Sequence, residues 1–115
     1  MTEIKATCFR ETGGEMVYTL RSVGHAEGFP EACAGISAIL WSLAGWMENT
    51  PERANGLIAA YRLESGAAEC LMLAETPSAG AASRAVWDLT LIGLMQLEKK
   101  YPQALRIEIR GGEPG

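Results

Sequence analysis

The chain has 115 residues, of which 48% are hydrophobic, and it carries a formal net charge of −4. This length suits one domain, which we expect to span residues 1–110, followed by a flexible tail at residues 111–115. The acidic balance argues against direct binding of nucleic acid, because phosphates attract basic surfaces, and three cysteines without a CxxC pair fit a reduced, cytoplasmic protein.

An N-terminal β-hairpin is the first predicted element. Residues 3–11 alternate between apolar and other side chains, which is typical of a strand. The segment Thr12–Glu15 contains two glycines, which allow the positive φ angles of a tight turn. A second strand then begins at Met16. His25, the only histidine in the chain, follows the end of that strand.

A helix is predicted from about Glu31, because apolar residues recur there at spacings of three and four. One face comprises Cys33, Ile36, Leu40, Leu43 and Met47. A second face comprises Ala34, Ala38, Trp41 and Gly45. A helix that is apolar on most sides must be buried on most sides, so we hypothesise that a partner subunit supplies part of that burial. Asn49 and Pro51 are stop signals. The apolar stretch is too short to span a bilayer, and the N-terminus lacks a secretory signal, so we expect no membrane association.

The second half of the chain predicts two strands, a helix and a final strand. The strands, residues 57–64 and 67–75, flank a Ser-Gly turn. Residues 76–83 are interpreted as a loop, with Ser83 capping a helix that runs to about Lys100. Residues 105–110 alternate cleanly and form the last strand. The order ββαββαβ predicts an α+β fold in which two helices cover a mostly antiparallel sheet.

His25 and Cys33 are the candidate catalytic pair. A thiol in the first turn of a helix lies near unpaired N–H groups, which stabilise a thiolate and can hold an oxyanion. An imidazole on the preceding loop, which bends at Gly28, can accept the thiol proton. Glu27 or Glu31 could orient that ring. The alternative is an inert cysteine buried on an apolar helix face beside a solvated histidine.

The other reactive residue types favour structural roles. Cys8 and Cys70 lie within strand patterns and are expected to be core thiols, and Ser37 is expected to pack inside its helix. The three tryptophans should pack, although an exposed one could line a groove. One histidine without a CxxC pair predicts no metal site, and the Gly-Gly pairs lack the context of a cofactor-binding loop.

The segment Gly24-His25-Ala26, followed by a glycine-containing loop and Cys33-Ala34-Gly35-Ile36-Ser37-Ala38, resembles the ribosomal-processing cysteine protease family (Prp). The C-terminal stretch LEKKYPQALRIEI also looks like that family's final helix, Tyr-Pro and last strand. The resemblance covers nearly the whole chain, although its specific part is about fifteen residues long.

The resemblance implies a homodimeric cysteine endopeptidase that uses no cofactor. By this match His25 is the general base and Cys33 is the nucleophile, with a flexible loop between them that orders on the substrate. The implied substrate is the N-terminal extension of a large-subunit ribosomal protein. Here the loop is shorter than usual, and Pro30-Glu31-Ala32 stands where the family has Asp and two apolar residues.

Two further hypotheses stay open beside the protease. The shortened loop and the missing Asp favour a non-catalytic dimeric module of the same fold that binds a peptide or a ribosome-associated partner. A structural homodimer, with the apolar first helix as its interface, is the third reading.

Overall fold

The structure is a computed structural model that describes residues 1–50 and 56–111. It confirms the α+β fold and the order ββαββαβ. The elements are β1 (Thr2–Arg10), β2 (Met16–Val23), α1 (Pro30–Asn49), β3 (Leu57–Glu64), β4 (Ala67–Ala74), α2 (Pro77–Lys100) and β5 (Leu105–Arg110). The predicted stop at Pro51 and the predicted tail beyond Gly111 lie outside the described residues.

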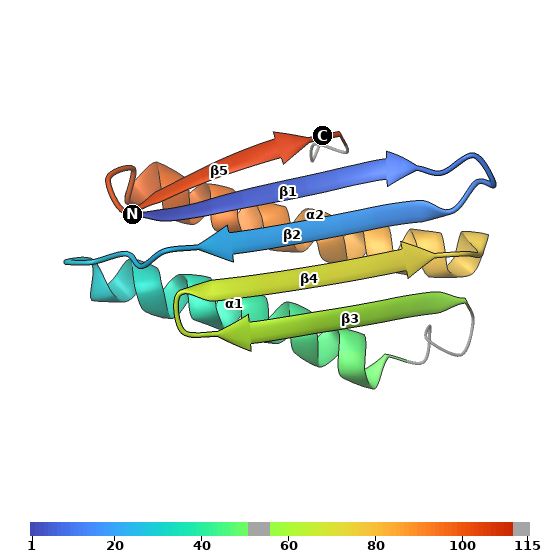
Figure 1. Cartoon of the computed structure of the whole chain (residues 1–115), viewed down its shortest axis with the longest axis horizontal. Coiled ribbons are helices and arrows are strands. Elements are labelled where there is room, and N and C mark those ends of the chain that lie inside the picture. Colours follow the sequence, from blue (N-terminus) through green and yellow to red (C-terminus); the bar gives the residue numbers. More distant parts are fainter. Residues whose placement is uncertain (51–55, 112–115) are drawn as a thin grey trace.

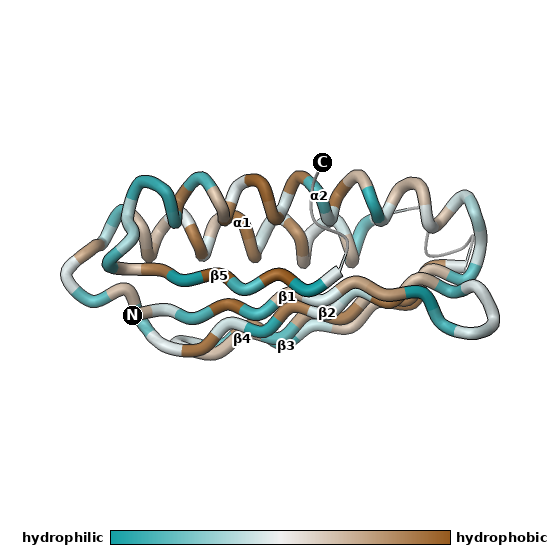
Figure 2. The backbone as a smooth tube through the Cα atoms, turned by 90° about the horizontal axis from the view of Figure 1, so that it is seen from above, coloured by the Kyte–Doolittle hydropathy of each residue, from teal (hydrophilic) through white to brown (hydrophobic). Residues whose placement is uncertain are grey.

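The five strands form one mixed sheet in the order β3-β4-β2-β1-β5. Every pairing is antiparallel except that between β1 and β5, which is parallel. Both helices lie on the same side of this sheet (Figure 1). Seen edge-on, the helices form one layer and the sheet another, and the opposite face of the sheet is uncovered (Figure 2). The protein is therefore a two-layer sandwich.

The core lies between the helix layer and the inward side chains of the strands. Alternate strand residues point to opposite faces, and the inward ones are buried together with one stripe of each helix. The largest fully buried side chains are Trp87, Tyr18, Ile4, Leu20, Leu43, Met47, Met72, Leu91, Leu94 and Leu105. Cys8 and Cys70 are buried among them, as predicted. Burial raises the pKa of the Cys70 thiol to about 11 and also raises the pKa of Cys8, so both stay protonated at neutral pH.

Helix α1 begins and ends close to the predicted residues, but its buried and exposed faces differ from the prediction. It begins with Pro30 at the first helical position, where proline is favoured because the missing N–H has no helical partner. Ile36 and Leu40 are buried, whereas Cys33, predicted on the same face, is exposed. The expected burial on most sides is wrong for the chain alone, because Trp41 is 60% exposed.

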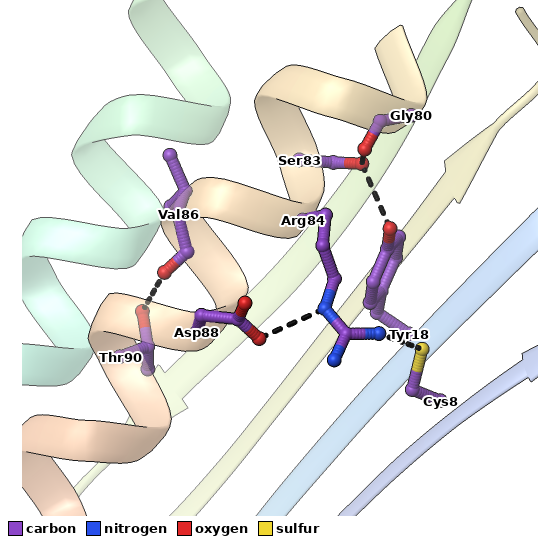
Figure 3. Close-up of polar contacts among 8 residues, drawn as sticks. All are labelled: Cys8, Tyr18, Gly80, Ser83, Arg84, Val86, Asp88 and Thr90. Carbon is purple, nitrogen blue, oxygen red and sulfur yellow. Dashed lines mark hydrogen bonds and ion pairs between the residues drawn. The ribbon is translucent and has the colours of Figure 1, made fainter. Parts of the chain in front are cut away.

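Helix α2 begins earlier than predicted. Thr76 is the N-cap residue, and its hydroxyl accepts a hydrogen bond of 3.2 Å from the N–H of Ala79. The segment interpreted as a loop is therefore the first two turns of the helix. Ser83 is not a cap: it is fully buried inside the helix, and its hydroxyl donates to the Tyr18 hydroxyl at 3.2 Å (Figure 3). The predicted C-terminal end at Lys100 is confirmed.

In the described part of the chain, no helix is long and apolar enough to cross a membrane. Residues 1–50 and 56–111 also contain no cluster of three or more His, Cys, Asp or Glu side chains that could hold a metal ion.

Candidate active site

His25 and Cys33 line the same small pocket, which has a volume of about 80 Å³. Three segments that are distant in the sequence build this pocket: the end of β2, the beginning of α1, and the turn between β3 and β4. The structure thus brings together the two residues that the sequence analysis singled out.

The turn between β3 and β4 positions the imidazole of His25. The N–H of Gly24 donates to the carbonyl oxygen of Gly66 at 2.9 Å, which ties the segment after β2 to this turn. The ring of His25 then lies over Gly66, so closely that a Cβ atom added there would be 2.6 Å from Nε2. Only a glycine at position 66 leaves room for this ring position. The His25 side chain is itself exposed.

Cys33 lies in the first turn of α1, directly after the buried Ala32. Its N–H donates to the carbonyl oxygen of Phe29 at 3.0 Å, which is the first hydrogen bond of the helix. The N–H groups of Glu31 and Ala32 precede that bond and are therefore the donors at this helix end. Cys33 is exposed, whereas Cys8 and Cys70 are buried. The reading of Cys33 as a buried core thiol is wrong.

The segment that joins His25 to α1 is short and anchored. Ala26 is 4% exposed and packs in a small cluster with Ala32 and Ala104, against which Phe29 and Tyr101 also pack. The rings of Phe29 and Tyr101 meet edge to face, with 6.2 Å between their centroids. The predicted bend at Gly28 is present, because that residue has a φ angle of +81°. Packing against the C-terminal end of α2 therefore fixes both ends of this connection.

Glu27 and Glu31 lie apart from the pocket. Both side chains are exposed, and neither residue lines the cavity that contains His25. No hydrogen bond or ion pair within residues 1–50 and 56–111 joins either carboxylate to the imidazole. The expectation that one of them orients the ring therefore finds no contact to support it.

Solved structures share this arrangement of elements. The chain matches the essential ribosomal processing protease Prp from S. aureus, in complex with a covalently linked product peptide, with a TM-score of 0.70 and 16% identity over 95% of this chain and 99% of the other. A second structure of that protease, with a substrate peptide, gives a TM-score of 0.66 at 16% identity over the same shares. SMU.848 from Streptococcus mutans gives 0.66 at 19% identity over 94% of each chain. The chain has the fold of these proteins. By sequence, no family model and no curated protein matches it.

A second pocket continues from the first. It has a volume of about 220 Å³ and shares Ser37, Leu40, Glu64 and Ala68 with the pocket of His25 and Cys33. Trp41 forms one wall and Leu63 another. Trp41 is eight residues after Cys33, a spacing that places both near one side of the helix. The prediction that an exposed tryptophan could line a groove is therefore confirmed at Trp41, whereas the contribution of Leu63 from β3 was not predicted.

Two buried hydroxyl groups were also missed. Thr2 and Ser22 line the pocket of His25 and Cys33, and they are 3% and 5% exposed. Nothing in the strand pattern distinguishes them from other inward positions. Only the packing of α1 over the sheet shows that they lie under the first turns of the helix.

Proposed function

We propose that the protein is a cysteine endopeptidase in which His25 is the general base and Cys33 is the nucleophile. The observation that carries this proposal is that the imidazole and an exposed thiol share one pocket at the beginning of α1. The fold shared with a ribosomal processing protease supports it.

The proposed reaction has two covalent stages. His25 takes the proton from Sγ of Cys33, and the sulfur attacks the carbonyl carbon of a peptide bond. The N–H groups of Glu31 and Ala32 are the candidate donors to the developing oxyanion, because they point out of the helix end. The protonated imidazole then gives its proton to the leaving amine. Water completes the cycle by releasing the acid from the thioester.

The groove beside this pair suits an extended peptide with a bulky apolar side chain. The cavity next to the site is walled by Trp41 and Leu63, and it continues directly from the pocket of Cys33. Burial of an apolar side chain against an exposed tryptophan is favourable. By the family resemblance, the proposed substrate is the N-terminal extension of a large-subunit ribosomal protein.

Alkylation with iodoacetamide followed by intact-protein mass spectrometry tests the proposed chemistry. We expect one fast modification, at Cys33, with a rate at neutral pH at least tenfold above that of a free cysteine in solution. Cys8 and Cys70 are internal controls that should not react in the folded protein, because both are buried. The His25→Ala variant should lose the rate advantage and keep the same site of labelling. A wild-type rate equal to that of free cysteine would contradict the proposal.

A non-catalytic binding module remains the second candidate, and the anchored loop favours it. Because Ala26 and Phe29 are packed against the end of α2, the pocket is fixed before any partner arrives. In this case a peptide of the ribosomal tail binds equally well to the wild type and to Cys33→Ala. Calorimetry with both proteins, combined with a search for cleavage products, separates this candidate from the protease.

We also propose that the protein is a cytoplasmic homodimer. The uncovered sheet face carries Phe9, Ile58 and Leu71, which are 47%, 53% and 43% exposed. The strand register places Phe9, Val17, Leu73 and Ile58 in one apolar row across four strands. A second copy can cover this row with the same row of its own face. Sedimentation equilibrium of the wild type and of Ile58→Glu tests this: the dimer should weaken in the variant.

A further inference from the structure

Ser22 and Thr2 are polar residues in an apolar setting, and they are 5% and 3% exposed. Ser22 occupies the helix-facing side of the sheet, in a row with Ala68 and Ile4, its neighbours on the two adjacent strands. Apart from Ser22, this row is apolar, and buried hydroxyls in such surroundings normally make hydrogen bonds. Within residues 1–50 and 56–111, neither the Ser22 nor the Thr2 side chain has a hydrogen bond to another residue. Neither hydroxyl oxygen is fully enclosed, since among those residues Nε1 of Trp87 is the one fully enclosed side-chain N or O atom without a partner. Both nevertheless line the pocket beside Cys33.

The pocket has the size and chemistry of a water site. A volume of about 80 Å³ holds a few water molecules, since one needs roughly 10–15 Å³ on this measure. A bound water also needs two to four polar partners. The hydroxyls of Ser22 and Thr2 and the imidazole of His25 supply three of them around one small cavity.

We propose that Ser22 and Thr2 hold the water molecule that hydrolyses the acyl-enzyme, an inference that rests on the proposed protease function. The water oxygen attacks the carbonyl carbon of the thioester on Cys33 while His25 accepts a proton from it. The C–S bond then breaks, the peptide leaves as a carboxylic acid, and the imidazole returns the proton to the sulfur. Ser22 and Thr2 are positioning residues, because they act through the water.

The proposal predicts that a variant lacking the Ser22 hydroxyl is impaired in the second stage of the reaction and not in the first. Ser22→Ala replaces a small side chain with one of similar size, so the packing under α1 should be kept. With p-nitrophenyl acetate as the probe, a burst of nitrophenolate measures acylation, and the slower steady state measures release of acetate. The rate of the burst should change by less than twofold. The steady-state rate should fall by about tenfold, the order expected when one hydrogen bond is lost from a transition state.

Three further variants make the result specific. Ser22→Thr keeps a hydroxyl and should restore the steady-state rate, and Thr2→Val should slow it as Ser22→Ala does. Ser83→Ala is the matched control, because it removes another buried serine hydroxyl that lies outside this pocket. It should leave the ratio of burst to steady-state rates unchanged. Intact mass spectrometry should show acetylated Cys33 accumulating in Ser22→Ala and not in Ser83→Ala.

The outcomes separate the two proposals. If the wild type releases nitrophenolate no faster than Cys33→Ala, or if its rate of release persists unchanged in His25→Ala, the protease function itself is overturned. If the wild type shows a burst that depends on His25, and Ser22→Ala and Thr2→Val leave the steady state unchanged, the water site is overturned and the protease stands. If Ser22→Ala slows the burst instead, the pocket receives part of the substrate, and the water site is again overturned.

Discussion

The position of His25 depends on a glycine in another part of the chain, and Gly66→Ala tests this dependence. Gly66 has a φ angle of +76°, and a Cβ atom there would lie 2.6 Å from Nε2 and 3.0 Å from Cε1 of His25. These distances are too short for non-bonded atoms, so the ring must leave its position. Since His25 is exposed, it can move outward without disturbing the core.

The size of the stability effect follows from the backbone conformation alone. An L-residue in the left-handed region costs about 1–2 kcal/mol. At about 4 °C per kcal/mol for a domain of this length, Tm should fall by about 4–8 °C. Gly14→Ala is the matched control, because Gly14 has a φ angle of +94° and a Cβ atom there meets nothing within 4 Å. Both variants should lose a similar amount of stability.

Only Gly66→Ala should affect the site. Because the chain contains one histidine, the imidazole resonances in an NMR spectrum report on His25 without ambiguity. We expect them to shift in Gly66→Ala and to stay unchanged in Gly14→Ala. Alkylation of Cys33 should also slow in the first variant alone. Unchanged imidazole resonances in Gly66→Ala, or equal shifts in both variants, would refute the placement of the ring over the turn.

Three other predictions concern the core and the groove. The raised pKa of Cys70, about 11 against an ordinary 9.0, means that the unfolded thiol ionises first as pH rises. The folded state should therefore lose about 2–3 kcal/mol between pH 9 and 11, and denaturation of Cys70→Ala should show a shallower loss. Ser83→Ala should cost about 1–2 kcal/mol in urea, because it leaves the buried Tyr18 hydroxyl without this partner; the loss should shrink in a Tyr18→Phe background. Trp41→Ala should raise KM for peptides with bulky apolar residues and change stability by less than about 0.5 kcal/mol, because the side chain is 60% exposed.

The strands and the ends of α1 could be predicted because local signals dominate there. Alternation with a period of two is set by the pleat of a strand, and it gave all five strands within one or two residues of their bounds. The Pro30 and Asn49 ends of α1 follow from residue types that favour helix boundaries. Sheet order could not be predicted in the same way, since the parallel pairing of β5 with β1 joins the two ends of the chain.

The two errors on the helices have different physical causes. At the beginning of α2, Thr76 and Pro77 are an N-cap and first-turn signature, but the run of small residues after them was interpreted as a loop. Small residues do not prevent a helix when its inner side packs, as Ala79 does with 0% exposure. At Cys33, periodicity predicted a side chain on the buried face of α1. In that turn the buried position belongs to the neighbouring Ala32, which is 0% exposed, so Cys33 lies outside the buried stripe.

The sequence predicted which residues belong to the candidate site, but it could not predict where in the fold they meet. The pairing of β2 with β4 ends at Val23 and Ala67, and beyond it the two segments diverge, one towards α1 and the other into the turn. The single hydrogen bond from Gly24 to Gly66 spans the point of divergence. The pocket lies at this point of divergence, and α1 lines its remaining side and contributes Cys33. Both glycines have positive φ angles, so the geometry that brings His25 to the pocket depends on residues that carry no chemistry of their own.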